Sequence, residues 1–141
     1  GADWVAYKPG IVQAAIANGE TTLLFYRSTW WGTCARQGRV LKKLRASYPE
    51  YNKTITFVLI DWDPYKNTEV TTSRRIPRRS TMVLIKDGKE IARLVAKSDE
   101  GEIKALLMKA VEQWKFSRWS KSGKLLGLIS IGEKIEVFEC S

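Results

Sequence analysis

Trp30-Trp31-Gly32-Thr33-Cys34 is the segment that decides the fold of this chain, because two kinds of secondary structure meet there. The preceding residues 21–26 are β-rich and apolar on both faces, as a central strand would be. After the segment, apolar residues recur at helical spacing, so Cys34 falls in the first turn of a predicted helix. A thiol in that turn faces the positive end of the helix dipole, which makes it a better nucleophile. The segment therefore indicates a reactive cysteine at a strand-to-helix junction.

Hydrophobic periodicity and turn residues extend this pattern in both directions along the chain. Helix stops at Asn18-Gly19 and Pro49, and a hairpin signal at Asp87-Gly88, separate the predicted elements. The predicted strands are residues 21–26, 54–60, 81–86 and 90–96. The predicted helices are residues 11–16, 34–48 and 65–73, and an amphipathic helix that follows Ser98 and extends through Trp114.

This order of elements predicts an α/β fold with one mixed sheet. The first two strands are joined through a helix, which favours a parallel pair with a right-handed crossover. The strands on either side of Asp87-Gly88 are expected to be antiparallel. Because the strands are apolar on both faces, helices must cover both faces of the sheet.

Four motifs, taken in this order, resemble the thioredoxin family over residues 3 to about 112. The segment from Trp30 to Cys34 is similar to the family's active site, which is usually Trp-Cys-x-x-Cys. Ile76-Pro77 is similar to the family's Ile-Pro, whose proline is cis and lies beside the dithiol. The other two matches are Ile60-Asp61-Trp62-Asp63, at the end of the central strand, and Lys86-Asp87-Gly88-Lys89-Glu90, in the final hairpin.

The resemblance implies a thioredoxin-like domain over residues 1–114, with a central mixed sheet between two layers of helices. The opening Asp3-Trp4-Val5-Ala6-Tyr7 and the run Ile76-Pro77-Arg78-Arg79-Ser80-Thr81 resemble a bacterial thioredoxin-like subgroup whose members are often exported. We therefore favour a periplasmic or exported protein, with the cytoplasm as the alternative.

Residues 115–141 differ in character and form a basic C-terminal extension. Residues 115–124 are rich in basic residues, Ser, Trp and Gly, which indicates a linker or a frayed helix end. Residues 125–131 and 135–140 are predicted as two strands around Gly132-Glu133, either at the edge of the main sheet or in an appended hairpin.

Two positions depart from the family pattern where the chemistry lies. In the family, the first cysteine attacks a substrate disulfide, and the second resolves the mixed disulfide by thiolate exchange. Trp31 stands in place of the first cysteine and cannot attack, and Cys34 matches the second. Phe25 stands where relatives commonly carry a buried Asp that assists proton transfer. The resemblance thus implies a protein disulfide oxidoreductase with a degenerate site, its dithiol activity absent or weak, and Cys34 as the catalytic residue for one-step exchange.

The groove beside this site gives an alternative function, because binding there needs no thiol. In relatives, the backbone next to the cis proline pairs with a protein or peptide substrate as a short β-strand. The alternative is therefore a non-catalytic module that binds extended or acidic peptides. Its binding residues are Trp30, Trp31, Gly32, Thr33, Ile76 and Pro77. Its rim consists of four guanidiniums suited to acidic groups, those of Arg74, Arg75, Arg78 and Arg79.

These residues also have plainly structural interpretations. Cys34 could be a small buried hydrophobe, or could pair with Cys140 if the tail folds back. Pro77 could be a structural turn, and the arginines a solvated rim. A weaker alternative is single-stranded nucleic acid, since aromatic and basic residues alternate near the C-terminus, although the same spacing suits a helix end packed on a core. These residues are Trp114, Lys115, Phe116, Arg118, Trp119 and Lys121.

Composition excludes several other classes of protein. The 141 residues include 24 Lys and Arg against 15 Asp and Glu, and the net charge of +9 favours solubility and acidic partners. The chain has no His, which excludes imidazole catalysis and His-ligated metal sites. Two cysteines cannot build a four-thiolate zinc site, so we expect no metal and no cofactor. No apolar run approaches the roughly 18 residues that a membrane span requires.

Overall fold

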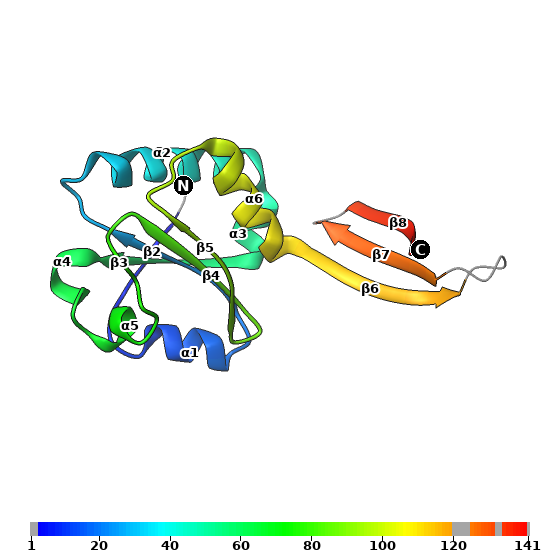
Figure 1. Ribbon diagram of the computed structural model, residues 1–141, viewed down its shortest axis with the longest axis horizontal. Helices are drawn as coiled ribbons and strands as arrows, with labels where there is room; N and C mark the ends of the chain where they lie inside the picture. The colour runs from blue at the N-terminus through cyan, green and yellow to red at the C-terminus, as the bar shows by residue number, and fades with distance from the viewer. Residues whose placement is uncertain (1–2, 120–124, 132–133, 141) are drawn as a thin grey trace. The chain divides into compact units, whose positions relative to one another are not determined.

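The computed structural model describes the backbone of residues 3–119, 125–131 and 134–140, and the side chains of residues 3–112. The chain divides into two units, Gly1–Ala110 and Val111–Ser141. Each unit contains its own sheet (Figure 1). The division lies close to residue 114, where the sequence suggests a boundary.

The first unit is built on a mixed five-stranded sheet with the order β1-β3-β2-β4-β5. Its strands are β1 (Val5–Ala6), β2 (Thr21–Arg27), β3 (Ile55–Asp61), β4 (Thr81–Lys86) and β5 (Lys89–Val95). β2 and β3 are parallel and β4 and β5 form an antiparallel hairpin, so both predictions of strand direction are confirmed. Sequence periodicity missed β1, which pairs with β3, because two residues are too short to show a pattern.

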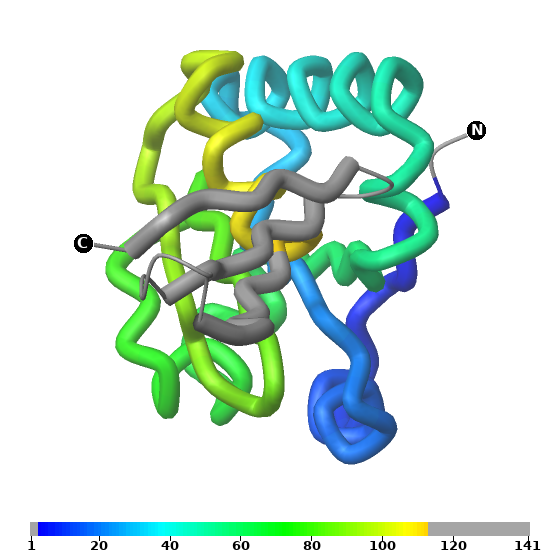
Figure 2. The backbone as a smooth tube through the Cα atoms, turned by 90° about the vertical axis from the view of Figure 1, so that its right-hand side faces the viewer, coloured from blue at the N-terminus to red at the C-terminus, as the bar shows by residue number. Residues whose placement is uncertain are grey.

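Helices cover both faces of this sheet, as predicted. They are α1 (Ile11–Ala17), α2 (Gly32–Ser47), α3 (Pro49–Thr54), α4 (Trp62–Tyr65), α5 (Glu69–Thr72) and α6 (Glu100–Val111). Figure 1 shows α2 and α6 on one side of the sheet and α1 and α5 on the other. Figure 2, turned by 90°, again shows α1 and α2 on opposite sides of the first unit.

The structure adds one helix to the prediction and divides another. Pro49 follows the end of α2 and opens the separate helix α3, because proline has no N–H to leave unpaired in a first turn. The predicted helix over 65–73 is two short helices, α4 and α5. The break between them is held by the hydroxyls of Thr68 and Thr71, which both donate to the carbonyl of Tyr65. Donation of this kind from a side chain to a backbone carbonyl competes with a continuous helix.

The core on the α1 and α5 side of the sheet is centred on Tyr26 of β2. Its ring is fully buried, and its hydroxyl donates to the carbonyl of Val70 in α5 at 2.5 Å. Burial raises the pKa of Tyr26 above its usual value. On α3, burial likewise raises the pKa of Tyr51 to about 12. Ile76 belongs to the same cluster as Tyr26, which anchors the segment between α5 and β4.

The second unit is a three-stranded antiparallel sheet in the order β6-β7-β8. Its strands are β6 (Glu112–Trp119), β7 (Leu125–Ile131) and β8 (Lys134–Cys140). The two strands predicted over residues 125–131 and 135–140 pair antiparallel, in a separate sheet rather than at the edge of the main one. Two expectations are wrong: α6 ends at Val111, so Trp114 is not helical, and residues 115–119 are a strand rather than a linker. Both corrections follow from pairing with β7, which supplies hydrogen-bond partners to the backbone of residues 112–119. Periodicity along the sequence does not reveal partners that lie elsewhere in the chain.

Candidate functional site

Cys34 lies in the first turn of α2 and is completely shielded from solvent, with an exposed fraction of 0%. Trp31 precedes the helix in an extended conformation, so the predicted strand-to-helix junction is confirmed. The Sγ atom of Cys34 lies 2.7 Å from the Oγ atom of Ser80, within hydrogen-bond distance. Such a contact stabilises the thiolate when the hydroxyl donates, and satisfies the thiol when the sulfur donates.

Ser80 is itself fully buried, and its backbone N–H and carbonyl take part in three hydrogen bonds. Its N–H donates to the carbonyl of Tyr26 at 2.8 Å, and its carbonyl accepts from the N–H of Ala96 at 2.9 Å. The same carbonyl accepts from Nε2 of Gln37, also at 2.9 Å. Its φ of 63° is in the left-handed region, which a non-glycine residue adopts only when its surroundings impose it. Ser80 is thus a fixed partner of Cys34.

This arrangement corrects the expectation for Pro77. The described residues contain no cis peptide bond, so the bond between Ile76 and Pro77 is trans. Pro77 is exposed, whereas the residue in contact with Cys34 is Ser80, immediately before β4. Arg78 and Arg79 separate Pro77 from Ser80 in the chain, and Ser80 is the residue that reaches the thiol. The predicted strand before Asp87-Gly88 begins at residue 81. The residue that directly precedes this strand is Ser80, so the sequence did contain a signal for its position.

Trp30, Trp31 and Arg79 form a surface that we call the Trp–Arg surface. The Arg79 guanidinium carbon lies 4.7 Å from the ring centroid of Trp30 and 4.7 Å from that of Trp31. The two indoles meet edge to face, with centroids 5.3 Å apart. Trp30 is 62% exposed, and its Nε1–H donates to a carboxylate oxygen of Asp63 at 3.1 Å. The sequence pointed to both tryptophans, but the pairing with Arg79 and Asp63 depends on tertiary structure.

The other rim arginines are not stacked on the tryptophans. The carbonyls of Arg74 and Arg75 accept hydrogen bonds from the guanidinium of Arg93. Arg93 also forms an ion pair with Glu90, and this hydrogen bond raises the pKa of Arg93. The Arg78 carbonyl accepts from the hydroxyl of Thr81. These contacts fix the backbone of the rim while Arg75 and Arg78 remain exposed.

The remaining two predicted binding residues lie at the start of α2. Gly32 is exposed, and Thr33 is half-buried with its hydroxyl accepting from the guanidinium of Arg36 at 3.0 Å. Gly32 and Thr33 directly follow Trp30 and Trp31 in the chain, so these four predicted binding residues form one continuous segment. Ile76, by contrast, directs its side chain into the core cluster around Tyr26.

The interior next to Cys34 is apolar where the resemblance implies a proton-transfer carboxylate. Phe25 is 1% exposed, and its ring centroid lies 5.7 Å from that of Trp4. The Arg45 guanidinium stacks over Phe57 at 3.8 Å and over Trp4 at 5.5 Å. Burial lowers the pKa of Arg45, which nevertheless donates to the carbonyl of Asp3. No group of three or more metal-ligating side chains occurs within the described part of the chain.

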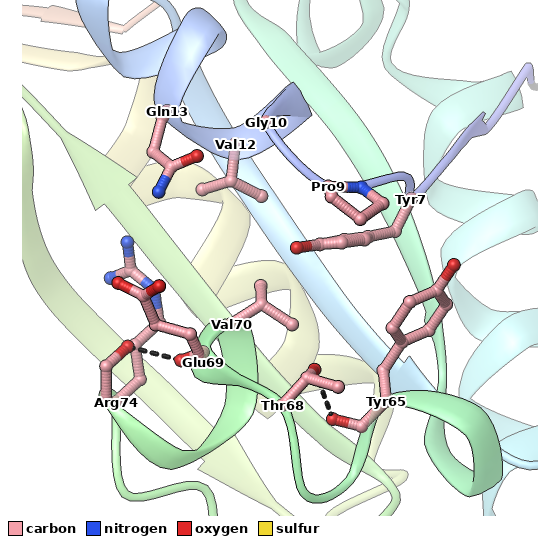
Figure 3. A pocket seen from close by; sticks show the side chains of 11 residues that line it. Tyr7, Pro9, Gly10, Val12, Gln13, Tyr65, Thr68, Glu69, Val70 and Arg74 are labelled. Carbon is pink, nitrogen blue, oxygen red and sulfur yellow. Dashed lines mark hydrogen bonds between the residues drawn. The ribbon is translucent and has the colours of Figure 1, made fainter.

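A separate pocket of about 280 Å³ lies between α1 and α5. Figure 3 shows the rings of Tyr7 and Tyr65 side by side at one end of this pocket, with Glu69 and Arg74 at the other. The tyrosine centroids are 4.8 Å apart, and burial is the main cause that raises the pKa of Tyr7. Of the predicted rim arginines, Arg74 lines this pocket. Cys34 is not among the lining residues, so the pocket is distinct from the surroundings of Cys34.

The described side chains do not include Cys140, so its suggested pairing with Cys34 lies outside the described residues. The same holds for the side chains of the aromatic and basic residues considered for nucleic acid. In the part of the chain that the structure describes, Cys34 is a free thiol. No helix there is long and apolar enough to cross a membrane.

No protein-family model matches this chain, and no curated protein does so. Solved structures do match it. Trxlp from Edwardsiella tarda EIB202 has 22% identity and a TM-score of 0.66, over 74% of this chain and 98% of that chain. Oxidised thioredoxin from Plasmodium falciparum has 20% identity and a TM-score of 0.62, over 76% and 97%. Thioredoxin NaTrxh from Nicotiana alata has 21% identity and a TM-score of 0.61, over 78% and 96%. Together with the sheet order and the two helical layers, these matches show that the chain has a thioredoxin-like fold.

Proposed function

We propose that this protein binds extended acidic segments of other proteins at the Trp–Arg surface, and that two-step dithiol exchange is absent. The observation that carries the proposal is the stacking of Arg79 on both indoles beside an exposed Trp30. The chemistry of the site supports it, because Trp31 has no thiol and Cys34 is fully buried. Thioredoxin-fold proteins that carry both cysteines act on protein substrates, and a binding surface can persist without the thiol.

The geometry favours an acidic ligand over a neutral one. Stacking uses the face of the Arg79 guanidinium, which leaves its N–H edge as a donor to a carboxylate. Its Nε is buried and has no hydrogen-bond partner among the described residues. A carboxylate that reaches this guanidinium forms charge-assisted hydrogen bonds, which are stronger than those of a neutral ligand. The exposed indole of Trp30 supplies apolar contact beside this charge.

An extended peptide that alternates Glu and Phe is expected to bind the full chain, and replacing its Glu by Gln is expected to weaken binding. Trp30→Ala and Arg79→Gln are each expected to raise the dissociation constant about tenfold, since one stacked contact is worth roughly 1.4 kcal/mol at such sites. Fluorescence anisotropy of the labelled peptide measures this.

Lys89→Gln is the matched control, because Lys89 is exposed on β5 and its loss changes the net charge by the same amount as Arg79→Gln. Equal weakening by Lys89→Gln and Arg79→Gln would show that only bulk charge attracts the peptide. No binding of the Glu-containing peptide would remove the proposal.

The contact between Cys34 and Ser80 supports a second candidate function, one-step thiol exchange. In that reaction the Cys34 thiolate attacks a substrate disulfide, the S–S bond breaks, one substrate thiol leaves, and a mixed disulfide remains on Cys34. A donating Ser80 hydroxyl favours the attacking thiolate. The reaction also requires the site to open, because Cys34 has no exposed surface.

Labelling of Cys34 tests whether opening is frequent enough for this reaction. In a Cys140→Ser background, an aromatic disulfide reagent is expected to label native Cys34 at least about 100-fold more slowly than the denatured chain. That factor corresponds to an opening free energy of about 3 kcal/mol. Comparable native and denatured rates would make one-step exchange the better function.

A further inference from the structure

A second cavity, of about 560 Å³, lies behind Cys34 on the side of the sheet that α2 covers. Its walls come from α2 and from the facing strands β2 and β3. On α2 the lining residues Ala35, Gly38 and Lys42 follow one another at roughly one-turn spacing, so a single helix face is turned toward it. The volume is within the usual range of small-molecule sites. Neither function proposed above uses this cavity.

The floor of the cavity is apolar and largely aromatic. Phe25, Leu59 and Trp4 contribute to it, next to Cys34. The Trp4 ring also packs edge to face on Phe57, with centroids 5.5 Å apart. Trp4 is therefore fixed from more than one side, and the aromatic floor exists before any ligand arrives. A flat aromatic group matches such a floor better than a flexible chain does, because it loses less rotational freedom on binding.

The rim of the cavity is cationic. It consists of Arg27, Arg39 and Lys42, and no Asp or Glu is among the residues that line the cavity. The Nε of Arg27 is buried and has no hydrogen-bond partner among the described residues. Three positive charges above an apolar floor are complementary to an anion that has an apolar body.

The neighbouring Lys43 differs from the cations that border the cavity. Lys43 forms an ion pair with Glu100 of α6 at 2.8 Å. None of the ion pairs that the described residues form involves Arg39 or Lys42. Arg39 and Lys42, at the border of the cavity, are thus among the many cations of the described residues that form no ion pair.

We propose that this cavity binds a small aromatic carboxylate. The aromatic ring lies against Trp4 and Phe25, and the carboxylate accepts hydrogen bonds from the cations of the rim. Arg27 contributes its positive charge from β2, and Arg39 and Lys42 close over the ligand from α2. The site is separate from the Trp–Arg surface, so each can be tested without the other.

Calorimetric titration of the full chain with 2-naphthoate tests the proposal, with the neutral amide 2-naphthamide as the matched ligand. We expect the carboxylate to bind with a dissociation constant of about 1 mM or tighter, and the amide at least about tenfold more weakly. Gly38→Leu is expected to abolish binding by filling the cavity. A Cβ at Gly38 would meet no atom within 4 Å, and leucine is a better helix former than glycine, so this variant is expected to fold.

The double variant Arg39→Gln/Lys42→Gln is expected to weaken 2-naphthoate binding at least about tenfold. Its control is Arg36→Gln/Lys43→Gln, which removes the same charge from α2 at residues outside the cavity lining. Equal losses in the two double variants, binding retained by Gly38→Leu, equal affinity for the amide, or no binding of 2-naphthoate would each overturn the proposal. Peptide binding at the Trp–Arg surface is expected to survive Gly38→Leu.

Discussion

Trp31→Cys is expected to raise the rate of disulfide reduction about 100-fold above the background rate measured with the unchanged chain, since we expect that chain to lack the two-step reaction. The substitution places a second thiol three residues before Cys34, at the start of α2. Side chains at that spacing are about 5–6 Å apart at Cβ, within reach of a disulfide after a small adjustment. A gain of this size is of the order contributed by one positioned catalytic group. The rate is measured on a disulfide-bonded model peptide with dithiothreitol as reductant.

The electron balance of this reaction defines its controls. The two protein thiols are oxidised to a disulfide while the peptide disulfide is reduced to two thiols, and dithiothreitol then restores the protein. Trp31→Ser removes the same indole without adding a thiol, and Cys34→Ser in the Trp31→Cys background removes the resolving sulfur. Both controls are expected to stay at the level of the unchanged chain. If Trp31→Cys is no faster than Trp31→Ser, the assignment of Trp31 to the attacking position is wrong.

Phe25→Asp is expected to lower the free energy of unfolding by roughly 4 kcal/mol or more at neutral pH. Phe25 is 1% exposed and packs on Trp4, so the change removes buried aromatic area and introduces a carboxylate that is largely excluded from water. Losses of this size are a large part of the 5–15 kcal/mol that holds a typical domain folded. Urea denaturation followed by fluorescence measures the change.

Phe25→Asn separates the cost of the charge from the cost of the lost ring, because Asn has the shape of Asp without its charge. A buried carboxyl has a higher pKa in the folded state than in the unfolded chain, so Phe25→Asp gains stability relative to Phe25→Asn as pH falls through the folded-state pKa. We expect the difference in unfolding free energy between the two variants to become smaller as the pH falls from 8 to 5. A gap that is absent at pH 8 would show that the carboxylate reaches water or a cation through the cavity behind Cys34.

The sequence predicted the main sheet well, because its strands and helices have strong local signals. Residues 21–26 are apolar on both faces and became a central strand, and Asp87-Gly88 determines the hairpin that follows. Local patterns failed where pairing partners come from elsewhere in the chain. Residues 112–119 form a strand because they pair with residues 125–131, although Trp114 continues a helical stripe in the sequence.

At the candidate site, the sequence by itself determined the chemical groups and the position of Cys34. Residue identity alone shows an indole at position 31 and an apolar ring at position 25, and the strand-to-helix junction places Cys34 in the first turn of α2. These conclusions depend on covalent structure and local periodicity, which need no distant contact.

Only the tertiary structure decided what surrounds these groups. It placed Ser80 rather than Pro77 against Cys34, because the segment before β4 is held by backbone hydrogen bonds to β2 and to Ala96. It also stacked Arg79 on Trp30 and Trp31 and left a cationic cavity under α2. Each of these contacts joins residues far apart in sequence, and their geometry follows from how the strands and helices pack, which residue spacing does not encode.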